Sequence, residues 1–271
     1  MGYAWLRKAA LGALTVAFLL TLISPSAWSR KKKKVEPTPT PTVTATPTAT
    51  PEVHAWNFNQ DKVGNPPADF DNIVGNWIVA VDATAPTPPN VVALQGGLGA
   101  QATALIHGLS YSLLTVVKDP TEYSDFTLEA SVKPVIGRFD CSGGVVFRYV
   151  DPSNYYALVA GCPSDYFTLS RVSDGKVEVL QQKVVPTDQG AWYKIKVNAQ
   201  GDHFTCYDDN KMVFDATDSK IGKGRVGFFG ANDSQAEFDD LTVTIMPAEA
   251  AGGGAASAAA TPAAPALPPP P

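Results

Sequence analysis

Apolar and polar side chains alternate with a period of two through much of residues 52–247, and turn-forming residues interrupt the alternation every eight to twelve positions. This period places successive side chains on opposite faces of an extended strand. No stretch of ten residues in this region carries the apolar stripe of an amphipathic helix. Short, regularly spaced strands are typical of an antiparallel sandwich or barrel. The pattern therefore predicts an all-β domain, built as a two-sheet antiparallel β-sandwich.

The clearest predicted strands cover residues 126–132, 144–150, 155–160, 167–172, 177–182, 192–199, 203–207, 211–215, 225–229 and 236–245. Residues 151–154 (Asp-Pro-Ser-Asn) suit a type I turn, and residues 173–176 (Ser-Asp-Gly-Lys) carry the Asp-Gly signal of a hairpin. Residues 60–110 hold Pro and Gly clusters and predict short strands within long loops, preceded by a first strand around residues 57–61.

The two flanks cannot bury a core. Residues 1–29 combine a short basic region, an apolar run of fifteen residues and a small-x-small site at Ala27-Trp28-Ser29, which predicts a secretory signal peptide. Residues 30–51 hold a basic run and a Pro/Thr spacer, and residues 248–271 form an Ala/Gly/Pro tail that we expect to be disordered. The domain at residues 52–247 is therefore expected outside the cytoplasm, in the periplasm, at the cell surface or secreted.

Five basic residues, 30–34, directly follow the apolar run, against two before it. The positive-inside rule opposes translocation of such a run, so an uncleaved N-terminal membrane anchor is the alternative. The run itself either begins the solvated linker or attaches electrostatically to an anionic surface. With 21 basic and 26 acidic residues overall and no basic face in the domain, we expect no nucleic-acid partner.

Five segments resemble, in order, a known family: SDFTLEASVK, GGVVFRYVDPSNYYALV, FTLSRVSDGKVEVL, AWYKIKVNAQGDHFTCYDDNKMVFDA and GKGRVGFFGANDSQAEFDDLTV. Together they are similar to the concanavalin A-like lectin/glucanase superfamily, a laminin-G-like jelly roll. More narrowly, they resemble bacterial exported 3-keto-disaccharide hydrolase or family 16 glycoside hydrolase-like domains. The resemblance implies a concanavalin A-like jelly roll that handles sugars, and this fold hosts lectins, hydrolases and adhesion modules alike.

The departures from that family argue against catalysis. A retaining family 16 glycosidase carries two carboxylates in a Glu-x-Asp-x-x-Glu pattern on one strand, and the chain has no such pattern. The nearest acidic clusters are residues 237–240 (Glu-Phe-Asp-Asp) and 122–125. In the keto-disaccharide hydrolase-like domains, the strand after the Gly-Gly-x-x-x-Arg strand usually carries an acid, whereas residues 154–159 here read Asn-Tyr-Tyr-Ala-Leu-Val.

A candidate ligand-binding face comes from the hairpin at residues 144–160. If Val150 pairs with Tyr155, Arg148 and Tyr155 lie together on the outer, concave face. The larger and more aromatic set of side chains then faces the core: Val145, Phe147, Tyr149, Tyr156, Leu158 and Ala160. An aromatic ring can stack on a sugar while a guanidinium donates to its hydroxyl groups. The next strand would add Thr168 and Ser170. The alternative is that Arg148 packs its stem over the sheet and pairs with a neighbouring acid.

Cys141 and Cys162 flank the same hairpin at near-opposite positions, so in an oxidising compartment we expect a disulfide between them. Cys206 alternates with Phe204 and is expected to be a buried thiol. The cysteines show no zinc-binding spacing.

Asp239 and Asp240 could join oxygens of residues 57–61 around a structural Ca²⁺, as in many sugar-binding sandwiches; hydrogen bonding to nearby backbone is the alternative. No other cofactor is expected. The three histidines are expected in loops or at the surface, since no nucleophile accompanies them: His54, His107 and His203. Trp56, Trp77 and Trp192 are expected to fill the core or cover its ends, unless one of them lines a ligand cleft.

These observations favour an exported, non-catalytic carbohydrate-binding or adhesion module whose partner is a glycan or cell-surface polysaccharide. One alternative is a glycoside hydrolase or lyase acting on (3-keto-)disaccharides or other glycans. Another is a structural cell-envelope protein whose sandwich packs against an envelope protein partner.

Overall fold

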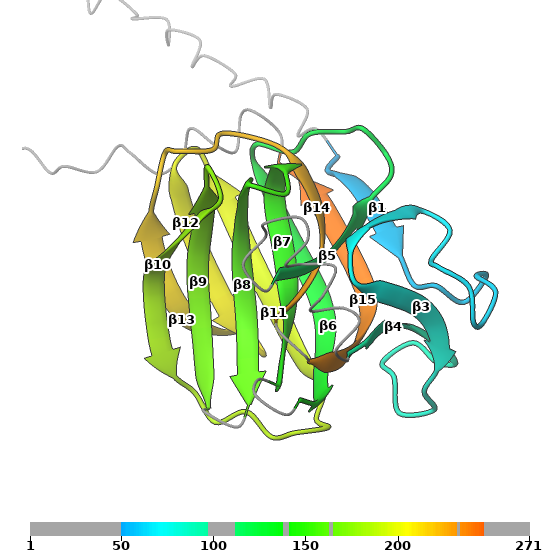
Figure 1. Ribbon diagram of the computed structural model, residues 1–271. Helices are drawn as coiled ribbons and strands as arrows, with labels where there is room; N and C mark the ends of the chain where they lie inside the picture. The colour runs from blue at the N-terminus through cyan, green and yellow to red at the C-terminus, as the bar shows by residue number, and fades with distance from the viewer. Residues whose placement is uncertain (1–49, 97–111, 138–140, 163–164, 232–233, 247–271) are drawn as a thin grey trace, which may run out of the picture. The chain divides into compact units, whose positions relative to one another are not determined.

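The computed structural model describes residues 50–96, 112–137, 141–162, 165–231 and 234–246, all within the second of two units of the chain, residues 48–271 (Figure 1). These residues form strands, turns and loops without a helix, so the all-β prediction is confirmed. Consequently, this part of the chain has no helix long and apolar enough to cross a membrane. The predicted signal peptide, most of the linker, the C-terminal tail and His107 lie outside the described residues.

The strands form two antiparallel sheets that stack face to face (Figure 1). Sheet A has the order β13 (Lys211–Thr217), β12 (His203–Asp208), β11 (Tyr193–Gln200), β6 (Phe126–Ile136), β15 (Gln235–Ile245), β4 (Asn90–Gln95) and β3 (Asn76–Val81), with β1 (Glu52–Trp56) also paired to β15. Sheet B has the order β10 (Lys176–Val184), β9 (Tyr166–Ser173), β8 (Asn154–Cys162), β7 (Cys141–Asp151), β14 (Arg225–Ala231), β5 (Ser112–Val117) and β2 (Phe70–Val74). Consecutive strands can belong to different sheets. For example, β6 pairs with β15 in sheet A, whereas β7 pairs with β14 in sheet B.

The start of the domain differs from the prediction. The first strand is β1, which ends at Trp56, and residues 57–61 form a turn instead of a strand. Phe58 in this turn has a left-handed backbone (φ 62°), a conformation that an extended strand does not contain. The turn lets the chain leave β1 and places the Phe58 ring in the core, where it is 5% exposed.

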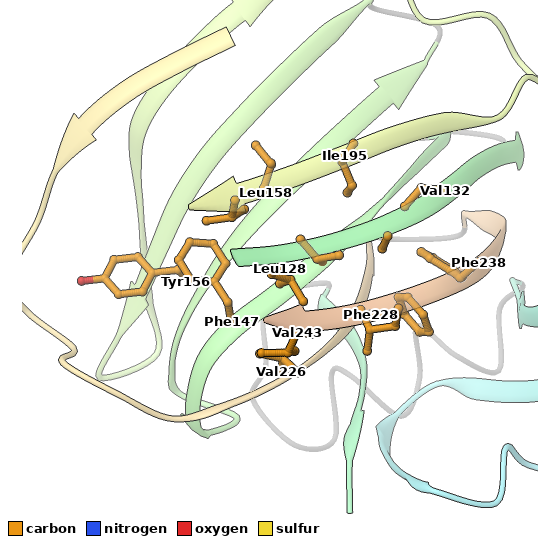
Figure 2. Close-up of a cluster of buried hydrophobic side chains, with 14 of the residues drawn as sticks. Leu128, Val132, Phe147, Tyr156, Leu158, Ile195, Val226, Phe228, Phe238 and Val243 are labelled. Atoms are coloured by element: carbon orange, nitrogen blue, oxygen red, sulfur yellow. The ribbon is translucent and has the colours of Figure 1, made fainter. Parts of the chain in front are cut away.

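The main core lies between the sheets, where alternate side chains of both inner faces meet (Figure 2). Phe147 of β7 stacks on Tyr156 of β8 at 5.3 Å between ring centroids, and Phe228 lies 4.7 Å from Phe238 across the sheets. Each such buried side chain stabilises the fold by about 1.5–3 kcal/mol. The apolar residues that alternate along the strands thus form the inner faces of the two sheets.

A second cluster of apolar side chains lies on the opposite, outer face of sheet B. Its buried members are Leu114, Val116, Val146, Tyr149, Tyr155, Ala157, Val159 and Val172. Tyr149 and Tyr155 stack with centroids 6.2 Å apart and are 3% and 1% exposed. This outer face is therefore not an open platform, in contrast to what we expected from the sequence.

A β-bulge changes the direction of two side chains on β7. The pairing with β8 is regular as far as Phe147 and shifts before Asp151, and Arg148 has a left-handed backbone (φ 46°). A bulge of this kind reverses the alternation locally. Arg148 therefore points inward and Tyr149 outward, the reverse of the predicted assignment, while the remaining core positions of the hairpin are as predicted.

Gly224, just before β14, makes room for the bulge. A Cβ atom at this glycine would lie 2.5 Å from both the carbonyl carbon of Arg148 and the carbonyl oxygen of Tyr149. Only a residue without a side chain allows backbone to approach so closely.

Candidate functional site

Arg148 is buried at one end of the sandwich with 1% exposure. Its guanidinium lies 4.9 Å from the centroid of the Phe204 ring. Nη1 donates to the carbonyl oxygen of Ile221 at 2.9 Å, and Nη2 donates to those of Ser124 at 2.7 Å and Gly201 at 2.6 Å. Nε is buried and finds no hydrogen-bond partner among the described residues. The side chain is thus a buried cation held by backbone carbonyls.

The three carbonyls belong to segments far apart in the sequence: the approach to β6, the β11–β12 turn and the β13–β14 connection. Hydrogen bonds from a charged donor are about twice as strong as neutral ones, so Arg148 ties these segments together. Burial lowers the pKa of Arg148, opposed by Tyr156, Asp125 and Asp202, but a guanidinium keeps its charge in proteins.

A pocket of about 270 Å³ opens beside this guanidinium. Its lining comprises Ser124, Asp125, Arg148, Gly201, Asp202, Ser219 and Gly222. One carboxylate oxygen of Asp125 accepts the N–H of Gly201 at 2.6 Å, which fixes this side chain, whereas Asp202 is exposed. Neither aspartate forms an ion pair with another described residue. The pocket therefore presents carboxylate and hydroxyl oxygens to whatever enters it.

Tyr155, Thr168 and Ser170 lie together on the outer face of sheet B, through the pairs Tyr155↔Val172, Val159↔Thr168 and Ala157↔Ser170. Arg148 does not lie with them, so the prediction that Arg148 and Tyr155 share the outer face is wrong. Arg225 lies beside the stacked pair of Tyr149 and Tyr155 instead, with its guanidinium 5.4 Å from the centroid of the Tyr149 ring. Burial raises the pKa of Tyr155 to about 12. A ligand-binding role for these three residues stays a prediction.

Asp239 and Asp240 hold a loop against sheet A. The two oxygens of Asp239 accept the N–H groups of Thr87 and Asp240, both at 2.8 Å, and Asp240 accepts the Thr87 hydroxyl at 2.8 Å. Asn59 of the 57–61 turn donates to the carbonyl of the same threonine at 3.0 Å. Burial, opposed by the backbone donor of Thr87, raises the pKa of Asp239 to about 6.

The predicted calcium ligands thus meet at one loop, but their oxygens already accept hydrogen bonds from it. Calcium needs six to eight oxygen ligands, and the described residues contain no group of three metal-ligating side chains. As placed, Asp239 and Asp240 do not fit a calcium cage, and a structural Ca²⁺ stays an untested prediction.

A second charged cluster lies on the outer face of sheet A. Lys133 of β6 pairs with both Asp82 and Glu237, and its ammonium lies 5.1 Å from the Trp192 ring. Burial raises the pKa of Asp82, but the hydrogen bonds from Lys133 and Thr84 outweigh this and hold it well below its usual value. The neighbouring cavity, lined in part by Glu237, measures only about 50 Å³. The two carboxylates thus share one lysine, which leaves the cluster with a net negative charge, and the lowered pKa of Asp82 does not suit a general acid.

The cysteines occupy structural positions. Cys141 and Cys162 form a disulfide across the open end of the β7–β8 hairpin, with Cα atoms 4.8 Å apart. Cys206 is a buried thiol, and burial raises its pKa to about 12.

Trp77 is fully buried, whereas Trp56 and Trp192 are half-buried. His54 hydrogen-bonds Tyr123 at 3.1 Å, and His203 contacts Asp215 at 2.7 Å.

Comparison with known proteins gives a fold and a partial sequence match. No family model matches the chain. The carbohydrate-binding module CBM66 from Bacillus subtilis superposes with a TM-score of 0.52 and 22% identity, covering 64% of this chain and 94% of the module. This likeness shows that the domain shares its two-sheet β-sandwich fold with the module. A β-glucanase from Bacillus licheniformis matches with a TM-score of 0.46 and 10% identity, covering 72% of this chain and 98% of that one.

Levanase from Bacillus subtilis (strain 168) is 31% identical to this sandwich protein over 122 residues, which is 44% of this chain and 18% of levanase. The chain thus matches less than a fifth of that enzyme's length.

Asp125, Asp202 and Ser219 were not among the predicted site residues of the sandwich. Asp125 belongs to an acidic cluster visible in the sequence, at residues 122–125. Asp202 follows a glycine in a hairpin turn, which is an ordinary turn signal. Nothing in the sequence links them to Arg148, because they meet only when three loops close over the end of the sandwich.

Proposed function

We propose that this chain is an exported, non-catalytic carbohydrate-binding module that takes a neutral sugar unit in the Arg148 pocket. The observation that carries the proposal is the pocket itself, in which Asp125 and Asp202 are free of ion pairs with described residues. Carboxylate oxygens accept hydrogen bonds from hydroxyl groups. The fold shared with a carbohydrate-binding module and the partial match to levanase support the same class of ligand.

A neutral ligand fits the charges better than an anionic one. The pocket holds two carboxylates and one guanidinium, and the guanidinium already donates to three carbonyls. An anionic sugar would face the two aspartates in a partly desolvated site, where like charges repel more strongly than in water. Arg148 acts as a positioning residue, because it holds the segments that carry Ser124, Gly201 and the 219–222 stretch.

Two further parts of the proposal rest on separate observations. The ion-paired state of Asp82, Lys133 and Glu237 supports binding without hydrolysis. The apolar run before the Pro/Thr spacer supports export, with an N-terminal membrane anchor as the alternative. A hydrolase acting on (3-keto-)disaccharides remains the competing function, and release of sugar from 3-keto-glucosides would demonstrate it.

The test is affinity electrophoresis of the full chain through gels containing neutral polysaccharides, levan among them because of the levanase match. Isothermal titration with the matching oligosaccharides then gives the dissociation constant. Asp202→Asn keeps the shape and removes the charge, and we expect binding about tenfold weaker, a change of about 1.4 kcal/mol.

Asp174→Asn is the matched control for this experiment. Asp174 is exposed in the β9–β10 hairpin, away from the lining of the pocket, and asparagine suits its left-handed backbone (φ 51°). The control should bind like the wild type. Absence of binding to every polysaccharide, or equal affinities for Asp202→Asn and the wild type, would sink the proposal.

A further inference from the structure

A second pocket, of about 180 Å³, lies where β1 ends and β2 begins. It is lined by Ala55, Trp56, Asn57, Phe58, Gln60, Asp61, Asp69 and Phe70, and shares no lining residue with the Arg148 pocket. Pockets for drug-sized ligands measure about 300–1,000 Å³. A cavity of this size therefore suits one small ring.

Three aromatic rings form the apolar part of this pocket. The Trp56 ring stands edge-on to Phe70, with centroids 6.1 Å apart and planes at 78°, and Phe58 packs on the same Phe70 ring at 5.6 Å. Phe58 and Phe70 are buried, whereas Trp56 is only half-buried. The indole is thus the aromatic surface that a ligand can reach, and its position is fixed by buried neighbours.

Polar side chains of the β1–β2 connection line the same pocket. The side-chain carbonyl oxygen of Asn57 accepts the N–H of Asn59 at 3.2 Å, and one carboxylate oxygen of Asp61 accepts the N–H of Ala68 at 3.1 Å, which orients both side chains. The exposed side chains of Gln60 and Asp69 make no hydrogen bond or ion pair with another described residue. The rim therefore offers an amide and a carboxylate that are free to bind hydroxyl groups.

We propose that this pocket is a second, separate sugar site, in which a neutral sugar ring stacks on Trp56 while its hydroxyl groups bond Gln60 and Asp69. An aromatic face matches the apolar C–H face of a sugar ring, and the polar rim matches the hydroxyl groups around it. The inference rests on the proposed function only for the class of ligand.

Two sites on one domain have a consequence for polymeric ligands. Once one sugar unit is bound, a second unit of the same polysaccharide is present at high effective concentration near the other site. The affinity for a polysaccharide that reaches both sites should then exceed the affinity of either site alone for the monosaccharide.

The test uses the full chain labelled with ¹⁵N-tryptophan and observes the indole N–H signals during titration with D-fructose, D-glucose, D-galactose and L-arabinose. Trp56→Phe identifies the Trp56 signal by its disappearance. We expect the Trp56 signal to shift with at least one sugar, while the signal of the fully buried Trp77 stays in place. The shift should persist in the Asp202→Asn variant, because the two pockets share no lining residue.

Gln60→Ala tests the rim without disturbing the core, since Gln60 is exposed in a turn. We expect the Trp56 titration to weaken about three- to tenfold, the size of effect that single aromatic or hydrogen-bond contacts give. Gln181→Ala, at an exposed position of β10, is the matched control and should leave the titration unchanged.

A Trp56 signal that no sugar moves, while Asp202-dependent binding persists, overturns the second site and leaves the proposed function standing. An unchanged titration in Gln60→Ala overturns it as well. If the Trp56 signal responds but Asp202→Asn binds polysaccharide like the wild type, the second site stands and the Arg148 pocket falls.

Discussion

Two cations of this sandwich, the partly buried Lys133 and the fully buried Arg148, are held by opposite kinds of partner. Lys133 lies between the carboxylates of Asp82 and Glu237, and the side chains of Lys133 and Asp82 are each 12% exposed. Arg148 instead donates to three backbone carbonyls, and the aspartates near it have no ion pair among the described residues. The first cluster borders a cavity of about 50 Å³ and the second a pocket of about 270 Å³.

The difference separates a structural cluster from a site that can bind. In the Lys133 cluster one lysine engages both carboxylates beside a cavity of only about 50 Å³, so little binding capacity is left for a ligand. In the Arg148 cluster the cation donates to loop carbonyls, so the Asp202 carboxylate and the second oxygen of Asp125 stay available. The same residue types therefore serve stability on sheet A and, in our proposal, sugar binding at the end of the sandwich.

The largest expected effect comes from Lys133→Met. Removing the cation leaves Asp82 and Glu237 close together without their shared ion-pair partner, although Thr84 still donates to Asp82, and we expect a loss of about 3 kcal/mol in the free energy of unfolding. Denaturant unfolding at neutral pH measures it. Lys194→Met, at an exposed lysine 3.8 Å from Glu129, should cost less than about 0.5 kcal/mol.

Glycan binding by the Lys133→Met protein sharpens the comparison. Under conditions in which the Lys133→Met protein is folded, its affinity for the glycan should equal that of the wild type, because no residue of the Lys133 cluster lines the Arg148 pocket. An affinity loss as large as that of Asp202→Asn would show that the two clusters are not separate.

The pH dependence of stability tests the loop after β3, which carries Asp82. Asp239 accepts the N–H of Thr87 in this loop. Asp239 has a pKa of about 6 in the folded protein against 3.8 as its ordinary value, so the folded state binds this proton more tightly. The stabilisation is therefore fully present below about pH 3.8 and is lost as the pH rises through about 6. Its size is about 2–3 kcal/mol.

Unfolding free energies measured from pH 4 to pH 7 should show this fall, and Asp239→Asn should lack it, although this variant is less stable overall. Equal slopes for the two proteins would mean that Asp239 does not carry the raised pKa.

Arg148→Met should cost about 2 kcal/mol, since three carbonyls lose their donor while a buried cation is removed, which offsets part of that loss. Unlike Lys133→Met, it should also abolish the binding that depends on Asp202, because the pocket walls separate. Denaturant unfolding and affinity electrophoresis give the two readings. Wild-type affinity in a folded Arg148→Met protein would contradict the positioning role.

Sequence reasoning was most successful where neighbours along the chain decide the outcome. The alternation of apolar residues predicted the β-sandwich, and the Asp-Gly turn predicted the β9–β10 hairpin, which the structure confirms. The same hairpin logic placed Cys141 opposite Cys162. It also placed Phe147, Tyr156 and Leu158 in the core, because strand periodicity and a short turn fix which side chains share a face.

The candidate site was harder to predict because one irregularity moved its central residue. A strict period of two puts Arg148 outside with Tyr155, but the bulge in β7 turns it inside. The bulge depends on the neighbouring segment, where Gly224 leaves room for the displaced backbone. A pattern read along one strand cannot contain this information, because β14 follows about eighty residues later.

By itself, then, the sequence determined the fold class, the hairpins and most of the core, since these follow from local periodicity and turn chemistry. Only the tertiary structure decided that Arg148 meets the carbonyls of Ser124, Gly201 and Ile221, and that Asp125 and Asp202 face a common pocket. The physical reason is that a buried cation needs acceptors wherever the folded chain provides them, and these come from loops joined only by the packing of the two sheets.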